Sequence, residues 1–528
     1  MTAMAMTMIE VDTEAGRVRR YIHGLEPAAA TFVNFVVQEP APSAVREFTT
    51  NGWDTVFAVR ASDVNGAITR RATSPKTWEA TLPASFVAPE LLASGTFGTW
   101  QLATGGSGGI VNMAIPFECT ITGTAAPVAV RGGVATVSVR LQYLPPEQGL
   151  PVCGSTPDSR EGAHRLVLDR GTDSRRSVGA LPVTVNSVTY AAPQQQDGLD
   201  GVLKEMLARS LNGHLDEFQH VFATVDIAGS AATDAFRWLK PTDRSYAYAE
   251  PTIGATLDNA VFAVLTMTEC RSRGSALQQI SPDAIPPGSR AGFTIAELLL
   301  MEKMILPNLA HEYPGTDASY FRLNSNSTQI TNTKPFALPP ARVGAVDYTP
   351  VMQTLRVTVS GDVIETYSYL RTNISPGIDA WAEITHYATL ELKQNADGTQ
   401  SIGYREAQPP VERTGHDVAV WVEVVSVAVD AIVGIATFGA AMAVKKIANV
   451  IVRVIVSILI GAVVAAIPAI LSKIPQFIAG SLPLPPIDAF VANATSAVKW
   501  TDARDFKITN LSLNGALQLG GDPQFAAA

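Results

Sequence analysis

One five-residue segment matches the nucleophile motif of serine hydrolases. Gly105-Gly106-Ser107-Gly108-Gly109 fits the pattern G-x-S-x-G, in which a strained turn between a strand and a helix exposes the serine. Here FGTWQL precedes the glycines and IVNMAIPF follows them, and both runs are typical of strands. Because the sequence predicts no helix after the motif, we interpret the segment as the tip of a β-hairpin and expect no hydrolase chemistry from Ser107.

The histidines and acidic residues predict no metal site. His214 and His220 bracket Asp216 and Glu217, but a separation of six residues places the two histidines well apart around a helix. We find no H-E-x-x-H, no paired C-x-x-C and no phosphate-binding G-x-x-x-x-G-K-[ST]. The sequence therefore predicts a protein that is not an enzyme and that carries no metal or cofactor.

The three cysteines, Cys119, Cys153 and Cys270, do not form a close pair. Their odd number and their spacing fit neither a disulfide framework nor a zinc site. We interpret them as small buried residues and leave one disulfide open.

The N-terminal residues do not have the order of a secretory signal. Such a signal places its positive charge before an apolar core, whereas Arg17, Arg19 and Arg20 come at the end of the first twenty residues. We therefore expect no export by the classical route. The location stays open between the cytoplasm and release by a non-classical route.

The composition indicates an unusual amount of apolar surface that must be hidden. Of the 528 residues, 47% are hydrophobic and only 16% are charged, against a usual charged share of about 25%. The apolar surface could be hidden in a membrane, in a partner or around an apolar ligand. The net charge is −9 and the basic residues are scattered, which excludes nucleic acid as an expected partner.

Alternating apolar and polar runs that flank a tight turn predict antiparallel hairpins. Three segments have this pattern: Val128–Leu144 around Gly132-Gly133, Leu355–Leu370 around Gly361-Asp362, and Thr385–Glu406 around Asp397-Gly398. Long strands joined by tight turns favour an antiparallel sheet with one buried and one solvent-exposed face.

Helices are predicted between these strands. Apolar residues at helical spacing indicate one helix over Trp53–Arg70 and another over Leu199–Leu211. Thr294-Ile295-Ala296-Glu297 has the pattern of a capping box and predicts a helix from Glu297 to Pro307. Strands and helices do not alternate as βαβ units, so we predict an α+β fold.

The stretch Val418–Leu482 is strongly apolar. Each half is long enough to cross a bilayer, for which about 20 apolar residues suffice. Polar residues such as Glu423, Asp430 and Arg453 fall on narrow stripes at helical spacing, however, and a charge at mid-bilayer costs about 2.5–3.5 kcal/mol. We therefore predict amphipathic helices that cover a sheet or line a lipid-accessible groove, with two transmembrane helices as the alternative.

Several segments resemble a known family in their order and spacing. They are Thr49–Ala58 (TTNGWDTVFA), Phe97–Leu102 (FGTWQL) followed by Gly105–Gly108, Trp238–Pro241 with Tyr246-Ala247, and Trp500–Gly521. Together they resemble the forty-seven-kilodalton protein and the OrfX proteins that are encoded beside botulinum neurotoxin in clostridia. The resemblance extends from about residue 45 to the end of the chain.

The resemblance implies a tubular lipid-binding (TULIP) fold, with elongated modules in which a long curved antiparallel sheet wraps amphipathic apolar helices. It also implies a role as an accessory component of a bacterial toxin or insecticidal system. On this basis we divide the chain as follows: residues 1–44 are an N-terminal extension, 45–195 and 196–410 are two parts of the tubular region, 411–500 are an apolar helical segment, and 501–528 are a closing strand.

Binding of a lipid or another apolar ligand is the function that we predict, because one acyl chain gains about 0.8 kcal/mol for each buried CH₂. The residues predicted to contact lipid are apolar positions of two helical segments, for which plain core packing is the alternative explanation: Leu298, Leu299, Ile305, Leu306, Ile432, Ile451, Ile455 and Ile458. Further expected partners are other toxin-complex proteins and a membrane surface in peripheral contact. Two other functions stay open, an assembly subunit that needs no lipid and a membrane-inserting toxin.

Overall fold

The structure is a computed structural model of the full chain. It describes residues 7–13, 16–22, 48–85, 89–144, 162–171, 181–195, 197–227, 238–313, 315–338, 340–343, 346–375, 378–395, 398–418 and 487–526. The chain divides into two units, Met1–Glu47 and Phe48–Ala528. In the first unit, β1 (Thr7–Thr13) and β2 (Gly16–Ile22) form an antiparallel hairpin.

The central sheet of the second unit has six described strands in the order β13-β14-β3-β15-β27-β26, all antiparallel. They are β3 (Thr55–Arg60), β13 (Pro241–Ala249), β14 (Val261–Thr268), β15 (Ala291–Ile295), β26 (Lys507–Leu513) and β27 (Leu517–Asp522). β15 pairs with β3 on one side and with β27 on the other, so it joins the beginning of this unit to its end. Every residue of β14 is buried, as expected for a strand that is covered on both faces.

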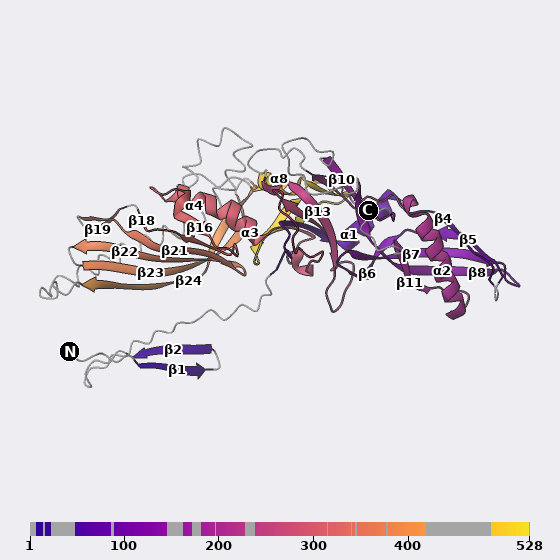
Figure 1. Ribbon diagram of the computed structural model, residues 1–528, viewed down its shortest axis with the longest axis horizontal. Coiled ribbons are helices and arrows are strands. Elements are labelled where there is room, and N and C mark those ends of the chain that lie inside the picture. The colour runs from indigo at the N-terminus through magenta and orange to yellow at the C-terminus, as the bar shows by residue number, and fades with distance from the viewer. Residues whose placement is uncertain are drawn as a thin grey trace. The chain divides into compact units, whose positions relative to one another are not determined.

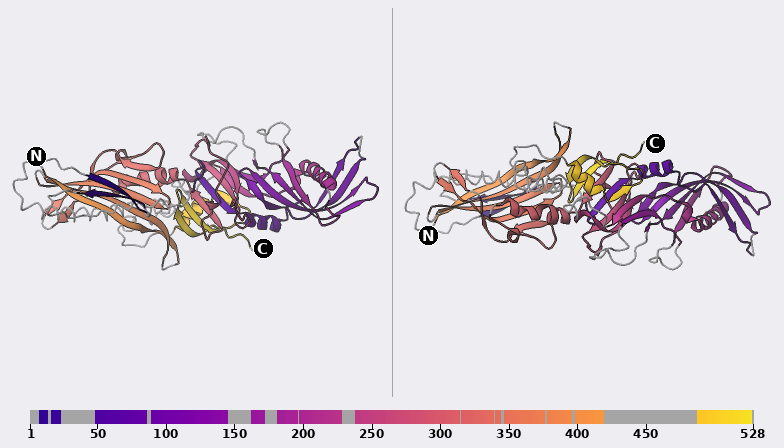
Figure 2. Two further views of the ribbon diagram at one scale, coloured as in Figure 1. Left: turned by 90° about the horizontal axis from the view of Figure 1, so that it is seen from below. Right: turned by 90° about the horizontal axis from the view of Figure 1, so that it is seen from above.

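A second antiparallel sheet has the strand order β11-β8-β7-β5-β4, and β6 also pairs with β7. The strands are β4 (Thr77–Leu82), β5 (Leu91–Phe97), β6 (Gln101–Ser107), β7 (Ile110–Thr122), β8 (Val128–Val139) and β11 (Val183–Thr189). Helix α2 (Asp197–Gly213) lies against this sheet and contacts both of its edge strands, β11 and β4 (Figures 1 and 2). The apolar side chains that α2 buries are Leu203, Met206, Leu207 and Leu211.

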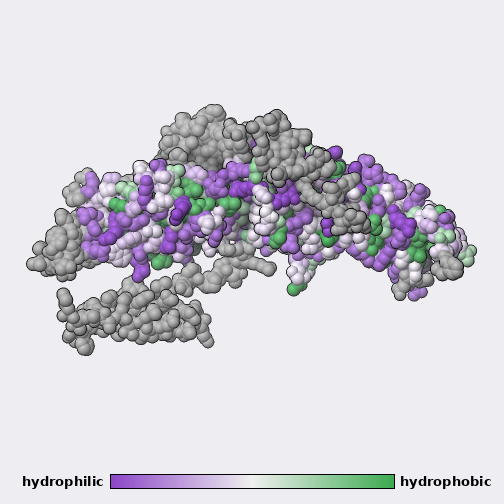
Figure 3. Space-filling model, viewed as in Figure 1, coloured by the Kyte–Doolittle hydropathy of each residue, from purple (hydrophilic) through white to green (hydrophobic). Residues whose placement is uncertain are grey.

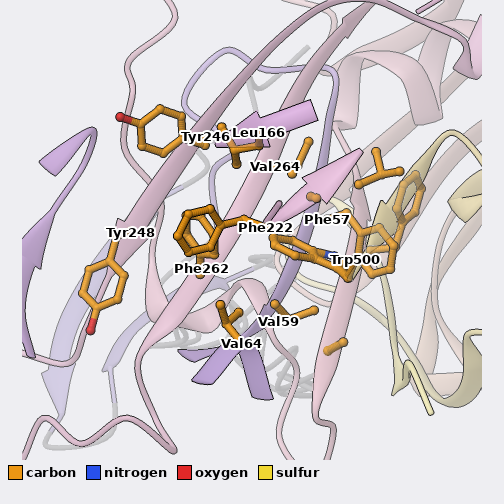
Figure 4. Close-up of a cluster of buried hydrophobic side chains, with 14 of the residues drawn as sticks. Phe57, Val59, Val64, Leu166, Phe222, Tyr246, Tyr248, Phe262, Val264 and Trp500 are labelled. Carbon is orange, nitrogen blue, oxygen red and sulfur yellow. The ribbon is translucent and has the colours of Figure 1, made fainter. Parts of the chain in front are cut away.

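A smaller antiparallel sheet has the strand order β25-β12-β10-β9. Its strands are β9 (Leu141–Leu144), β10 (Gly162–Leu168), β12 (Ala223–Ile227) and β25 (Val498–Trp500). Aromatic side chains join it to the central sheet. Trp500 of β25 lies 5.5 Å from Phe262 of β14 and 6.2 Å from Phe57 of β3, measured between ring centroids (Figure 4).

The remaining large sheet has the strand order β16-β17-β21-β22-β23-β24, and β18 also pairs with β21. The strands are β16 (Phe321–Leu323), β17 (Gln329–Asn332), β18 (Phe336–Ala337), β21 (Val351–Ser360), β22 (Val363–Ser375), β23 (Ile378–Gln394) and β24 (Gln400–Val418). β19 (Ala341–Val343) and β20 (Val346–Tyr348) form a separate antiparallel pair.

A continuous helical segment runs from Glu297 to Glu312, and its end contacts β16 of this sheet. It consists of α3 (Glu297–Leu299), a π-helical stretch η4 (Leu300–Ile305) and α4 (Leu306–Glu312). The other described helices are α1 (Ala61–Arg71), α8 (Asp488–Thr495) and the short 3-10 helices η1 (Leu215–Glu217), η3 (Pro282–Ala284) and η5 (Ala318–Tyr320).

The prediction of a β-rich fold with large antiparallel sheets is confirmed, and so are two of the three hairpins. β21 and β22 meet at Gly361-Asp362, and β23 and β24 flank Asp397-Gly398. The prediction of a hairpin at Gly132-Gly133 is wrong, because β8 continues through both glycines. There the register with β7 shifts beside Phe117, and a Cβ at Gly133 would lie 2.7 Å from the ring of Phe117. The glycines accommodate a bulge and a close contact rather than a turn.

The helix predictions have a mixed outcome. The helix over Leu199–Leu211 is confirmed as α2, whereas Trp53–Arg70 is half strand, with β3 followed by α1. The prediction of a capping box at Thr294-Ile295-Ala296-Glu297 is also wrong. Thr294 is the fourth residue of β15 and fully buried, and the helix begins at Glu297 without a side-chain cap.

Two further predictions concern cysteines and membrane spans. Cys119 is a buried free thiol, and burial raises its pKa to about 11. Cys270 is disulfide-bonded, so the disulfide that the sequence left open is present, and the interpretation of Cys270 as a plain buried residue is wrong. Cys153 lies outside the described residues. So do residues 419–482, which are the apolar stretch Val418–Leu482 without its first residue, the end of β24. Within the described residues, no helix has the length and apolar character needed to span a membrane.

Candidate ligand-binding cavity

Four of the predicted lipid contacts lie on the helical segment from Glu297 to Glu312. Leu299 and Ile305 have no exposed surface and belong to the main hydrophobic core. Leu298 and Leu306 are half-buried, and Leu306 packs against the same core. Core packing accounts for these positions, and their contact with lipid stays a prediction. The other four predicted contacts lie outside the described residues: Ile432, Ile451, Ile455 and Ile458.

A cavity of about 610 Å³ lies where the end of α2 meets β4 and β5. Buried apolar side chains line it: Trp78 of β4, Phe97 of β5, Trp100 and, from α2, Leu211. Ligand cavities in proteins span about 300–1,000 Å³ and are lined mainly by apolar and aromatic side chains. The size falls in this range. The lining combines the apolar side chains with polar residues, and the exposed polar ones are Thr77, Glu79, Ser94, Thr96, His214 and Glu217.

The aromatic wall of the cavity follows from the pattern of the two strands. β4 alternates exposed and buried residues, which turns Trp78 inward, and Gly95 of β5 pairs opposite it. The rings of Trp78 and Phe97 stack at 5.8 Å, and Trp100 meets Phe97 edge-on at 5.5 Å. Neither indole N–H has a hydrogen-bond partner among the described residues, and the packing of the rings positions both tryptophan side chains.

The polar residues at the cavity include two with carboxylates, one with an imidazole ring and four with hydroxyl groups. Glu79, His214 and Glu217 line it and are exposed to solvent. Nδ1 of His214 lies 3.0 Å from the carbonyl oxygen of Ser210. Because a carbonyl oxygen only accepts, Nδ1 carries the hydrogen in this contact.

The G-x-S-x-G segment is confirmed as a hairpin tip. β6 ends at Ser107 and β7 begins at Ile110, so a strand follows the serine where a hydrolase needs a helix. The tip is held by two hydrogen bonds of 2.8 Å between the backbones of Gly108 and Tyr248. Within the described ranges no three His, Cys, Asp or Glu side chains are grouped so that they could hold a metal ion.

His220 gives the protein a pH-dependent stability. It is 1% exposed, its Nδ1 lies 3.1 Å from Thr73 Oγ1, and burial lowers the pKa of its ring to about 4. The unfolded chain binds the proton more tightly, so the free energy of unfolding falls as the pH drops from about 6.5 to 4. Between pH 7 and 4 the free energy of unfolding of the native protein should fall by on the order of 3 kcal/mol more than that of the His220→Gln variant.

Urea unfolding at a series of pH values measures this difference. Equal slopes for the native protein and for His220→Gln would contradict the assignment.

Comparison with known proteins assigns the chain to a family. A family model described as OrfX-like, Protein OrfX2/OrfX3/P47, matches residues 50–521. The chain belongs to this family. It is 25% identical over 520 residues to Protein OrfX3 of Paraclostridium bifermentans, a match that covers 90% of this chain and 99% of that protein. Protein OrfX3 of Clostridium botulinum (strain Kyoto / Type A2) is 26% identical over 522 residues, with the same coverage.

Solved structures show that the OrfX-like chain shares its fold with P47. The structure of P47 from Clostridium botulinum A2 matches with a TM-score of 0.59 and 15% identity, over 90% of this chain and 98% of that one. P47 of Clostridium botulinum E1 matches with a TM-score of 0.58 and 14% identity, over 91% and 100%.

Two of the segments that carry the OrfX-like resemblance contribute residues to junctions in the fold. Trp53 is 2% exposed, and its indole N–H donates to the carbonyl oxygen of Leu277 at 2.8 Å. The hydroxyl of Tyr246 donates to the carbonyl oxygen of Gly109 at 2.8 Å and accepts from the N–H of Leu141 at 2.7 Å. Burial raises the pKa of Tyr246 to about 12. Trp53 and Tyr246 therefore stabilise the fold and do not form the cavity.

Proposed function

We propose that this OrfX-like protein binds a lipid or another apolar ligand in the cavity beside α2 and catalyses no reaction. The observation that carries the proposal is the aromatic cavity between the end of α2 and strands β4 and β5. A second proposal, based on the resemblance to proteins of neurotoxin gene clusters, is that it serves as an accessory component of a bacterial toxin or insecticidal system.

The arrangement of α2 supports a tubular lipid-binding body. α2 contacts both edges of a path of five strands, β11-β8-β7-β5-β4. Laid flat, five strands would separate these edges by roughly 19 Å, whereas a helix is only about 10–12 Å across. A sheet that curves around one helix would bring both edges to it, and such a curved sheet is the feature expected of the tubular superfamily. A helix of 17 residues is about 25 Å long, so α2 would also reach both edges by lying across the strands.

The visible surface shows no broad apolar patch that could face a lipid. On the face shown in Figure 3, the coloured residues are mostly polar, and the hydrophobic ones form small separate patches. Burial of an eight-carbon chain would gain on the order of 6 kcal/mol before the costs of association, at about 0.8 kcal/mol per CH₂. The cavity is a described place where part of such a chain could be removed from water.

A bulky side chain at the cavity should block binding. Thr77 is an exposed residue of β4 that lines the cavity, so Thr77→Trp fills space there without disturbing the core. We expect the affinity for a fluorescent fatty acyl probe to fall about tenfold, the equivalent of two buried methylene groups. Fluorescence titration of the full chain measures this change.

Thr81 supplies the matched control. It is exposed on the same face of β4, four residues along the strand, and is not among the residues that line the cavity. Thr81→Trp should bind the probe as the native protein does. Equal affinity of the native protein and Thr77→Trp would place the ligand elsewhere.

A further inference from the structure

One aromatic ring separates His220 from the cavity wall. The ring centroid of His220 lies 6.1 Å from that of Phe218 and 5.0 Å from that of Phe222. Phe218 in turn stacks on Trp100, with a centroid distance of 4.9 Å and an interplanar angle of 13°. Because Trp100 lines the cavity, the packing around His220 helps to position the cavity wall.

The turn after α1, residues 72–74, contacts both His220 and Trp100. Oγ1 of Thr73 lies 3.1 Å from Nδ1 of His220. Oγ of the next residue, Ser74, accepts a hydrogen bond of 3.0 Å from the backbone N–H of Trp100. A movement of this turn or of Phe218 that exposes His220 would therefore also displace a partner of Trp100.

The surroundings of His220 suit only a neutral ring. The residue is 1% exposed, and its Nε2 is buried without a hydrogen-bond partner among the described residues. Protonation would place an N–H donor and a positive charge there, and a buried charge without a partner is costly. The same burial causes the low pKa of this ring, about 4.

The charged groups that face His220 come from α1 and from the segment after β25. Asp502 attracts a protonated ring and Arg71 repels it. The carboxylate of Asp502 is already bound by Arg71 at 2.6 Å and by Arg70 at 3.1 Å. Two guanidinium groups thus share one carboxylate, which leaves little attraction for a third cation.

From this arrangement we infer that His220 is a pH-sensitive switch of the cavity: its protonation separates the ring from the turn 72–74 and from Phe218, displaces Trp100 and weakens ligand binding. The effect on binding rests on the proposed function, whereas the movement itself needs no ligand. In the open form water reaches the ring, whose pKa returns to about 6.5. The open form therefore gains over the closed form as the pH falls from about 6.5 to 4, and the closed form is favoured above that range.

Hydrogen exchange at Trp100 measures the opening in the full chain. Its amide exchanges when the hydrogen bond to Ser74 breaks, so mass spectrometry of peptides that contain Trp100 reports its protection. After correction for the intrinsic exchange rate at each pH, this protection should fall about twentyfold from pH 7 to pH 5. Peptides from the buried strand β14 should stay more strongly protected at both pH values. Equal protection of Trp100 and β14 would mean that only global unfolding exposes Trp100, and would overturn the switch.

Variants assign the opening to His220. His220→Phe keeps an aromatic ring against Phe218 and Phe222 but takes up no proton, and His220→Gln tests the same point with a polar side chain. In both variants the protection of Trp100 should change by less than about threefold between pH 7 and pH 5. The matched control is His386→Gln, which removes another buried histidine, 8% exposed, from β23 and should keep the native change. A His220 variant that also keeps the native change would overturn the inference.

Calorimetric titration with octanol tests the effect on binding, because octanol stays uncharged at both pH values. The native protein should bind octanol less tightly at pH 5 than at pH 7, by up to about twentyfold, whereas His220→Phe should bind it equally. Equal affinities of the native protein at the two pH values would overturn the effect on binding and leave apolar binding standing. Absence of octanol binding at both pH values would overturn the proposed function, and the exchange of Trp100 would then decide on the opening alone.

Discussion

Replacement of Asp54 by alanine should lower the free energy of unfolding by about 3–5 kcal/mol. Asp54 is 2% exposed, and its carboxylate accepts hydrogen bonds from the backbone N–H of Thr268 at 2.7 Å and from its hydroxyl at 3.0 Å. It also lies 3.3 Å from Nε of Arg271. The substitution would leave the buried donors of Thr268 without an acceptor, which costs about 1–3 kcal/mol for each unsatisfied group.

The loss of stability should extend beyond β3 and β14, because Arg271 connects Asp54 to further charged side chains. It contacts Glu302 of the π-helical stretch at 3.3 Å and Glu269 at 3.1 Å, and Lys303 contacts both of these carboxylates. Urea unfolding measures the change. Asp505, which is exposed, provides the control, since Asp505→Ala should stay within about 0.5 kcal/mol of the native protein. A similarly small effect of Asp54→Ala would contradict the account of this junction.

Replacement of Gly95 by alanine should destabilise the sheet around α2 by about 3 kcal/mol. A Cβ at this position would overlap the backbone oxygen of Glu118 and lie 2.8 Å from the Cβ of Cys119, both on the neighbouring strand β7. Neither neighbour is the flexible end of a side chain, so the strands would have to separate. Trp78 pairs opposite Gly95, and the cavity wall would be displaced with it.

Gly201 provides a control of opposite sign. It lies in α2, where a Cβ would meet no atom within 4 Å. Alanine is favoured over glycine in a helix by about 0.8–1.0 kcal/mol, so Gly201→Ala should stabilise the protein by about that amount. Thermal unfolding of both variants measures the two shifts. A stable Gly95→Ala variant would contradict the tight approach of β5 and β7.

Local turn chemistry explains which strands the sequence could predict. Gly361-Asp362 and Asp397-Gly398 stand between alternating runs, and a residue that adopts a positive φ angle is what a tight hairpin needs: φ is +57° at Gly361 and +85° at Gly398. Gly132 also has a positive φ angle, +62°, yet it lies within a strand. The residue type alone does not separate a turn from a bulge, because the difference depends on the pairing with β7.

Burial on both faces explains why β3 was mistaken for a helix. Five of its six residues, all except Arg60, are buried, so the strand lacks the alternation that identifies a half-exposed strand. Thr294 misled the capping prediction in a similar way. It is a threonine in a fully buried strand, and only the pairing of β15 with β3 and β27 shows this.

The cavity could not be predicted from the sequence. Its wall combines Trp78, Phe97 and Trp100 with Leu211, which is more than a hundred residues further along the chain. The sequence showed the apolar face of α2 and the aromatic residues of the FGTWQL segment separately. Their meeting depends on how the sheet is arranged around the helix. The apolar positions that the sequence predicts to contact lipid lie instead partly on the 297–312 segment, where Leu299 and Ile305 are buried core residues.

The central claim is that an apolar ligand occupies the cavity beside α2. Mass spectrometry of an organic extract from the purified full chain tests it most directly. The account predicts a lipid or another amphipathic molecule in the extract of the native protein and of Thr81→Trp, and its loss from Thr77→Trp. Extracts that are empty for all three proteins, from preparations that also bind no added lipid, would contradict it.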